Sequence, residues 1–303
     1  MLDDASQQPA ISPARPAVSE RSGQVEVLTK VCVDELLSAF GLGRLRHGRH
    51  SLELLCRIPA QRLARQVATY DEIVGESGLA AGGAWALERM ARRVEVEGLE
   101  NVPREGPLLL AANHPGLSDT LVLFANTPRP DLRVVAAERP FLDALPNTSR
   151  YLFTVNEQPP GHFGLVRTAT RHLRGSGAVL TFPGGKIEPD PAVLPGAVEA
   201  LEHWSASVDL FAQLVPDLVV VPVIVSGVLS PTALRNPLTF LRRRKKDREW
   251  LAATLQMLTP ALRNVTTRIA FGRPVHADDS ADRSVSRAAL GEARRLIELG
   301  GAR

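Results

Sequence analysis

Two side chains that could move a proton stand five positions apart in segment 113–119, which reads Asn-His-Pro-Gly-Leu-Ser-Asp. A histidine can take a proton from a hydroxyl when a carboxylate holds its other ring nitrogen. A spacing of five does not place both side chains on one face of a helix. We therefore expect His114 in a loop that turns at Pro115 and Gly116. We expect Asp119 in the first turn of the next helix, where the helix N-terminus favours its charge. The pair predicts general-base chemistry without a nucleophile of its own.

A structural interpretation of the same segment stays open. His114 could be a hydrogen-bonded loop residue, with Asp119 capping the helix that follows. Ser118 is a poor nucleophile candidate because no Gly-x-Ser-x-Gly elbow surrounds it. Its simpler role is to cap the helix.

A second candidate segment, residues 182–188, reads Phe-Pro-Gly-Gly-Lys-Ile-Glu and follows an apolar run. Its glycines allow the backbone to approach an anion, and Lys186 adds a point charge. A nucleotide P-loop is excluded, because Leu180 and Ile187 stand where Gly and Ser or Thr are required. A plain turn from strand to loop is the alternative.

The elements around these segments predict an α/β domain over residues 94–303, with a mostly parallel central sheet flanked by helices. The expected strands are 108–112, 133–137, 178–182, 218–225 and 267–271. The expected helices are 120–125, 165–174, 196–214, 248–258 and 284–299. Ligand sites in such sheets collect where strands end, and both candidate segments fall at such places.

The chain before this domain is expected to be helical. Residues 25–93 show apolar spacing for helices over about 27–40, 52–67 and 82–93, with Pro59 as a candidate interruption. Residues 1–24 are rich in Pro, Ser, Gln and Ala, which predicts a disordered tail. Leu52, Leu55, Ile58 and Leu63 give the helical segment an apolar surface, which could serve domain packing or membrane contact.

Three blocks now give a family resemblance. Asn113, His114 and Asp119 match an Asn-His-x4-Asp block, segment 182–188 partly matches a Phe-Pro-Glu-Gly block, and Val221-Pro222-Val223 matches a late Val-Pro-Val block. Over residues 94–275 the chain thus resembles the glycerophospholipid acyltransferase superfamily, which includes lysophosphatidic acid acyltransferases.

The resemblance implies transfer of a fatty acyl group from acyl-CoA or acyl-carrier protein to a hydroxyl of a lysophospholipid or glycerolipid. No cofactor is implied beyond that acyl co-substrate. His114 would deprotonate the acceptor and Asp119 would orient His114. The expected substrate-binding residues are Asn113, Asn156, Arg167, Phe182, Pro183, Gly184, Gly185, Lys186, Glu188 and Pro222.

The sequence departs from the family pattern at two points. Gly184 stands where the family has Glu, and we expect Glu188, four residues on, to occupy the same space. Asn156 stands where an upstream Phe-Ile-x-Arg block has Arg, and Arg167 or Arg150 could substitute for that arginine. Both departures concern the groups expected to hold an acceptor phosphate.

A basic run with flanking aromatic rings predicts peripheral contact with an anionic membrane. A solvated helix start is the alternative. Nucleic-acid binding is disfavoured, because the net charge is only +3 and no stacking pattern or known module accompanies the run. The expected membrane-contact residues are Phe240, Arg242, Arg243, Arg244, Lys245, Lys246 and Trp250.

The remaining composition favours a cytoplasmic protein, peripheral on the inner face of the cell membrane. The chain of 303 residues shows neither a signal peptide nor an apolar run long enough to span a bilayer. Its two cysteines form no disulfide framework. No metal is predicted, since His47 and His50 lie among arginines. Two other functions stay open: a thioesterase or esterase using the same dyad, and a non-catalytic lipid-binding protein.

Overall fold

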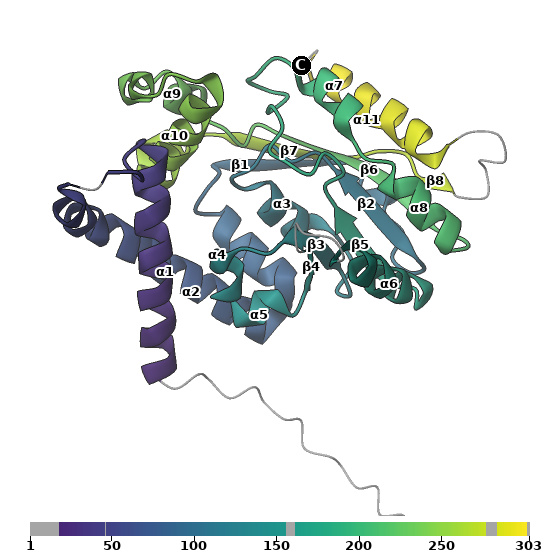
Figure 1. Cartoon of the computed structure of the whole chain (residues 1–303). Coiled ribbons are helices and arrows are strands. Elements are labelled where there is room, and N and C mark those ends of the chain that lie inside the picture. The colour runs from purple at the N-terminus through teal and green to yellow at the C-terminus, as the bar shows by residue number, and fades with distance from the viewer. Residues whose placement is uncertain (1–17, 46, 156–160, 277–283, 302–303) are drawn as a thin grey trace, which may run out of the picture.

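An eight-stranded sheet forms the middle layer of the protein (Figure 1). The computed structural model describes residues 18–45, 47–155, 161–276 and 284–301. The strand order is β1-β7-β6-β2-β5-β3-β4, with β8 paired to β6. The strands are Arg93–Glu97 (β1), Leu108–Ala112 (β2), Arg133–Ala137 (β3), Leu152–Val155 (β4), Ala178–Thr181 (β5), Val219–Ser226 (β6), Thr266–Phe271 (β7) and Val275–His276 (β8).

The sheet is mostly parallel, as predicted. Strands β6, β2, β5, β3 and β4 run parallel to one another, whereas β7 and β8 pair with β6 in the antiparallel sense. Strand β1 runs parallel to β7 at one edge. The carboxyl ends of β2, β5 and β3 therefore meet at one end of the sheet, where ligand sites of such folds form.

Helices cover both faces of the sheet (Figure 1). The helices of more than one turn are Val18–Ala39 (α1), Arg49–Leu87 (α2), Asp119–Asn126 (α3), Gly161–Arg174 (α6), Ser207–Leu214 (α8), Lys245–Leu258 (α10) and Val285–Gly301 (α11). The one-turn helices are Pro140–Asp143 (α4), Pro146–Ser149 (α5), Ala197–Ala200 (α7) and Pro231–Leu234 (α9). Short 3-10 turns are Leu99–Asn101 (η1), Leu201–His203 (η2), Pro237–Leu241 (η3) and Pro260–Leu262 (η4).

Strand β2 shows how the sequence builds two cores. All five of its residues are buried. Leu108, Leu110 and Ala112 pack into the core on the α2 and α3 side. Leu109 and Ala111 pack into the core that α6, α8 and α11 cover. Successive side chains of a strand point to opposite faces of the sheet, so a continuous apolar run suits a strand that is buried on both faces.

The predicted elements need several corrections. Strands β1, β4 and β8 were not expected, because β1 and β4 are partly exposed edge strands and β8 has two residues. The single helix expected over 196–214 is broken into α7, η2 and α8, with Trp204 outside any helix. Helix α10 begins at Lys245, three residues earlier than predicted.

The N-terminal segment is helical, but its elements differ from those expected. Helix α1 already begins at Val18, so the predicted tail is too long, and residues 1–17 lie outside the described residues. Helix α2 continues through Pro59 and kinks instead at Gly78, whose φ is 84°. Strand β1 begins at Arg93, close to the expected start of the α/β domain; the domain division itself stays a prediction.

Helix α2 crosses α3 closely enough to fix its position. A Cβ at Gly83 would lie 2.8 Å from the Leu121 carbonyl oxygen and 2.9 Å from the Ala125 nitrogen. Only glycine allows two helix backbones to approach this closely. Helix α3 carries Asp119 at its first position, so this crossing places one half of the predicted dyad.

Candidate active site

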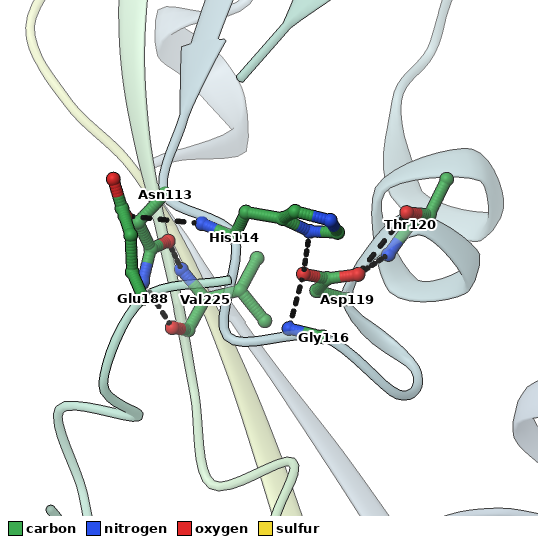
Figure 2. A network of polar contacts seen from close by, with 7 residues as sticks. All are labelled: Asn113, His114, Gly116, Asp119, Thr120, Glu188 and Val225. Atoms are coloured by element: carbon green, nitrogen blue, oxygen red, sulfur yellow. Dashed lines mark hydrogen bonds and ion pairs between the residues drawn. The ribbon is translucent and has the colours of Figure 1, made fainter. Parts of the chain in front are cut away.

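His114 and Asp119 are in direct contact, as the sequence predicted (Figure 2). The His114 Nδ1 atom lies 2.7 Å from the Asp119 Oδ2 atom. Because an ionised carboxylate only accepts hydrogen bonds, Nδ1 carries the proton and donates it. The other ring nitrogen, Nε2, is then the basic atom. Asp119 is 1% exposed, so its charge acts in a poorly solvated setting.

The turn between the two residues uses left-handed backbone at Gly116 (φ 83°) and Leu117 (φ 60°). Glycine adopts this conformation readily, whereas a leucine there is strained by about 1–3 kcal/mol. Asp119 stabilises the turn. Its Oδ2 atom also accepts the Gly116 N–H at 2.8 Å, and its Oδ1 atom accepts the Thr120 N–H at 2.5 Å (Figure 2). The same carboxylate thus fixes the loop and the ring.

The charges around His114 favour its protonated form. Burial by itself would lower the pKa of the imidazole, but the Asp119 hydrogen bond and the negative charges of Asp119 and Glu188 outweigh it. The pKa of His114 is therefore raised above the ordinary histidine value of 6.5. A base with a raised pKa holds a transferred proton more firmly.

A large, mostly apolar cavity of about 1110 Å³ lies against His114. Ligand cavities commonly measure about 300–1,000 Å³, so this one can hold a long ligand. Its walls come from α2, α3, the end of β3, α4, the loop after β5 and the end of α10. The apolar side chains of this lining include Leu63, Val67, Tyr70, Trp85, Leu121, Phe124, Val134, Ala136, Phe141, Leu145 and Met257.

The loop after β5 forms the wall of the cavity next to His114. Phe182, Gly185 and Lys186 line it, as does Ile187. The Phe182 ring lies 4.5 Å from the imidazole, centroid to centroid. Lys186 is exposed at this wall and adds a positive charge to it. This part of the loop is where the sequence placed it.

Three predicted substrate-binding residues hold the site together from outside the cavity lining. Both polar atoms of the Asn113 side chain bond to the backbone of Val225, at 2.9 and 2.7 Å (Figure 2). Pro183 is buried, and its carbonyl oxygen accepts the Ser205 N–H. Pro222 is buried on β6, and its carbonyl oxygen accepts the Gly272 N–H.

Glu188 and Gly184 also lie outside the lining, and they contact each other. Glu188 is 7% exposed, and its two carboxylate oxygens accept the His114 N–H and the Trp204 Nε1–H. A side chain at Gly184 would collide with the Glu188 carboxylate. Burial raises the pKa of Glu188, although the His114 and Trp204 donors oppose the rise.

Neither arginine proposed from sequence lines the cavity beside His114. Arg167 is exposed on α6 and lines a separate groove with Arg171 and Arg174. Arg150 follows α5 and is exposed, and it is absent from the cavity lining. Asn156 lies outside the described residues.

Arg139 and Trp204 were missed by the sequence reasoning. Arg139 lines the cavity just after β3, at the same end of the sheet as His114. Its place after a parallel strand was the signal that could have revealed it. Trp204 sits in the break of the predicted helix and had no comparable signal.

Ser118 differs from its predicted role. It precedes α3, but its hydroxyl makes no capping bond, and its buried Oγ has no hydrogen-bond partner. It is also absent from the cavity lining.

Most residues of the predicted membrane-contact run are exposed, and one forms an ion pair within the protein. Phe240 is 67% exposed, and Arg243, Arg244, Lys245 and Lys246 are exposed as well, as is Trp250. Arg242 differs, because its guanidinium pairs with Asp247 at 2.9 Å and packs against Gly41.

Membrane-spanning helices and metal-ligand clusters are both absent from the described residues. These residues contain no helix long and apolar enough to cross a membrane. They also contain no group of three or more His, Cys, Asp or Glu side chains arranged to hold a metal ion.

The fold and the site define an α/β protein with a His–Asp dyad beside an apolar cavity. Residues 93–226 match the family model described as Acyltransferase, so this part of the chain is an acyltransferase domain of the superfamily that the sequence predicted. The predictions of this superfamily and of an O-acyltransferase enzyme are thereby confirmed.

One solved structure is similar over most of its length. It is the crystal structure of the 1-acyl-sn-glycerophosphate (LPA) acyltransferase PlsC from Thermotoga maritima, with 16% identity and a TM-score of 0.45. The likeness covers 93% of this chain and 95% of that chain. At this level it carries no inference about substrate. No curated protein sequence matches the chain.

Proposed function

We propose that this protein transfers a fatty acyl group from a CoA or acyl-carrier-protein thioester to a hydroxyl of a lysophospholipid or glycerolipid. The observation that carries the proposal is the contact of His114 Nδ1 with buried Asp119, on the wall of an apolar cavity. This arrangement supplies an oriented general base, His114, and a cavity that can accommodate a lipid chain.

The dyad supports direct transfer. His114 Nε2 takes the proton of the acceptor hydroxyl as the oxygen attacks the thioester carbonyl. The new C–O bond forms, the C–S bond breaks, and the imidazolium returns the proton to the leaving thiolate. Asp119 keeps the ring oriented and stabilises its charged form. Neither cysteine nor Ser118 lines the cavity, which favours a mechanism without an acyl-enzyme.

The cavity supports a long acyl chain as the bound group. Its lining exposes mainly carbon, from helices α2 and α3 and from β3. Each buried methylene contributes about 0.8 kcal/mol to binding, so a chain gains affinity with each carbon that enters.

Of the four cationic side chains that the structure describes in the cavity lining, Lys186 and Arg139 support an acceptor with an anionic headgroup. Lys186 belongs to the loop after β5 that also carries Phe182, and Arg139 follows β3. Arginine suits the planar oxygens of a phosphate, and lysine provides a point charge. We therefore favour a phosphate-bearing lysolipid over a neutral glycerolipid.

The basic run supports docking on an anionic membrane. Arg244 is the N-cap of α10, and Lys245 and Lys246 are its first residues. Cations at a helix N-terminus oppose the helix dipole, at about 0.3–1 kcal/mol each. Fold stability therefore does not account for their position. Binding to an anionic membrane surface would be favoured by about 1 kcal/mol for each of these charges.

Apolar side chains beside the run fit the same surface. Phe240 and Leu241 are 67% and 63% exposed. Helix α1 packs against both α10 and α2, and α2 exposes Leu54, Leu55 and Ile58. Leu52 and Leu63 of the same helix instead pack toward α1. The apolar surface predicted for this segment therefore serves packing with some residues and leaves others exposed.

Product analysis tests the proposal. Purified protein is incubated with a long-chain acyl-CoA on vesicles that contain lysophosphatidic acid, and the lipids are analysed by mass spectrometry. We expect the diacyl product and free CoA in equal amounts. Free fatty acid formed at the same rate with or without acceptor would show a hydrolase instead.

A variant separates catalysis from lipid binding. His114→Ala should abolish product formation while vesicle binding persists, and His203→Ala, an exposed histidine on η2, should behave as wild type. Lipid binding without turnover in the wild-type protein, with any acyl donor, would favour the non-catalytic alternative.

A further inference from the structure

Glu188 forms hydrogen bonds with both main-chain polar groups of His114. The Glu188 N–H donates to the His114 carbonyl oxygen at 2.8 Å. The His114 N–H donates to the Glu188 Oε2 atom at 3.2 Å (Figure 2). His114 lies just beyond the end of β2, so the strand ladder no longer holds it. These two bonds replace the ladder at the residue whose ring must be placed.

The second carboxylate oxygen is held as well. Glu188 Oε1 accepts the Trp204 Nε1–H at 2.9 Å. The loop makes room for this oxygen by having no side chain at Gly184, where a Cβ would collide with it. A glutamine could serve only one of the two donors, because its NH₂ group is itself a donor. The site therefore requires a carboxylate and not merely a polar side chain.

The carboxylate also acts on the imidazole through its charge. The charged groups near the ring are Asp119 from α3, Glu188 and Lys186 from the loop after β5, and Arg139 from the end of β3. Farther along the cavity lie Arg89, which follows α2, and Arg263, which follows η4. Among the described residues, Asp119 and Glu188 are the negative charges that favour protonation of His114.

We propose that Glu188 is a positioning residue for His114, and not a contact for the lipid acceptor. It fixes the backbone that carries the ring and supplies a second negative charge to it. The link from this role to turnover rests on the proposed acyltransferase function. The geometric and electrostatic role does not depend on that function.

The test combines NMR with kinetics on the full chain. The imidazole of His114 is titrated by NMR, with its signal assigned by its loss in His114→Ala. Glu188→Gln should shift the titration midpoint to lower pH, because one of two negative charges is removed. Glu202→Gln, an exposed glutamate on η2, is the matched control and should leave the midpoint unchanged.

The kinetic arm separates positioning from substrate contact. In Glu188→Gln we expect kcat for acyl transfer to fall about 100-fold, the scale of a small misplacement of a reacting group, with KM for the lysolipid nearly unchanged. A folded variant with an unshifted midpoint would overturn the proposal. A raised KM with wild-type kcat would overturn it too, since it would make Glu188 an acceptor contact.

A second variant covers a failure of Glu188→Gln to fold. Glu188→Asp keeps the charge but withdraws it from the His114 N–H, so kcat should fall while the midpoint stays near that of wild type. Wild-type kcat in this variant would overturn the proposal. If the wild-type protein shows no acyl transfer, the proposed function fails, and the NMR titration still decides the role of Glu188.

Discussion

The Asp119 Oδ2 atom lies 2.7 Å from His114 Nδ1 and at the same time 2.8 Å from the Gly116 nitrogen. One oxygen therefore orients the ring and closes the strained turn that carries it. This explains why a histidine and an aspartate five residues apart can act together although they share no helix face. In the proposed mechanism, the same carboxylate therefore serves both the local structure and the chemistry.

Replacing Asp119 with Asn should reduce kcat about 10³–10⁴-fold. The amide NH₂ can donate to Nδ1, which moves the ring proton to Nε2 and removes the basic atom, as the same change does in Ser-His-Asp triads. Steady-state kinetics measures the loss, and thermal unfolding checks that the fold is kept. A kcat within about tenfold of wild type would show that the ring does not depend on this carboxylate.

The pH profile should report the raised pKa of His114. The base works only when neutral, so kcat/KM should fall as the pH drops through the histidine pKa. Because the Asp119 bond and the negative charges of Asp119 and Glu188 outweigh the effect of burial, this limb should lie above 6.5. Rates measured between about pH 5 and about pH 9 locate it. A limb well below 6.5 would contradict this assignment.

Filling the cavity should shorten the preferred acyl chain. Ala136 lies on β3 and lines the cavity. The larger side chain in Ala136→Phe would occupy part of the cavity volume. Each methylene that no longer enters costs about 0.8 kcal/mol, or about fourfold in affinity. Competition between long-chain and short-chain acyl-CoA measures the preference. The control Ala288→Phe, at an exposed position of α11, should leave the chain-length preference unchanged. Equal preferences in the two variants would show that the acyl chain binds outside this cavity.

Neutralising the basic run should release the protein from anionic vesicles. Changing Arg243, Arg244, Lys245 and Lys246 to Gln removes about 4 kcal/mol at low salt, about a 1,000-fold loss in partitioning. Sedimentation with phosphatidylserine vesicles measures it, and added salt should weaken wild-type binding. The control changes Arg167, Arg171 and Arg174 on α6. An equal loss in the control would indicate attraction by overall charge alone.

Adding a methyl group at Gly184 should disturb the site through Glu188. The Cβ of Gly184→Ala would displace the Glu188 carboxylate, and overpacking of this kind costs about 1–3 kcal/mol. We expect a lower melting temperature and a lower kcat. The double variant with Glu188→Ala should regain stability but not kcat. Recovery of both would mean that only the space, and not the carboxylate, matters.

The dyad and the sheet could be predicted because their signals are local. Strand β2 is a continuous apolar run, and the turn at Gly116 follows it directly. The strands missed at the sheet edges, β1 and β4, are partly exposed, so they lack such a run. Their place in the sheet depends on partners far along the chain.

The surroundings of the dyad could not be predicted, because they depend on long-range packing. One wall of the cavity comes from α2, which is kinked at Gly78 and packs against α3. Trp204 leaves its expected helix to reach Glu188, sixteen residues earlier in sequence. Arg167 was chosen by type, but its helix places it on another groove, and Arg139 lines the cavity instead.

The most direct measurement is the single-turnover rate of diacyl lipid formation by His114→Ala, compared with His203→Ala under the same conditions. We predict that His203→Ala matches wild type, while His114→Ala forms product at least about 100-fold more slowly with its fold and vesicle binding intact. Product formation by folded His114→Ala at the wild-type rate would contradict the assignment of His114 as the base.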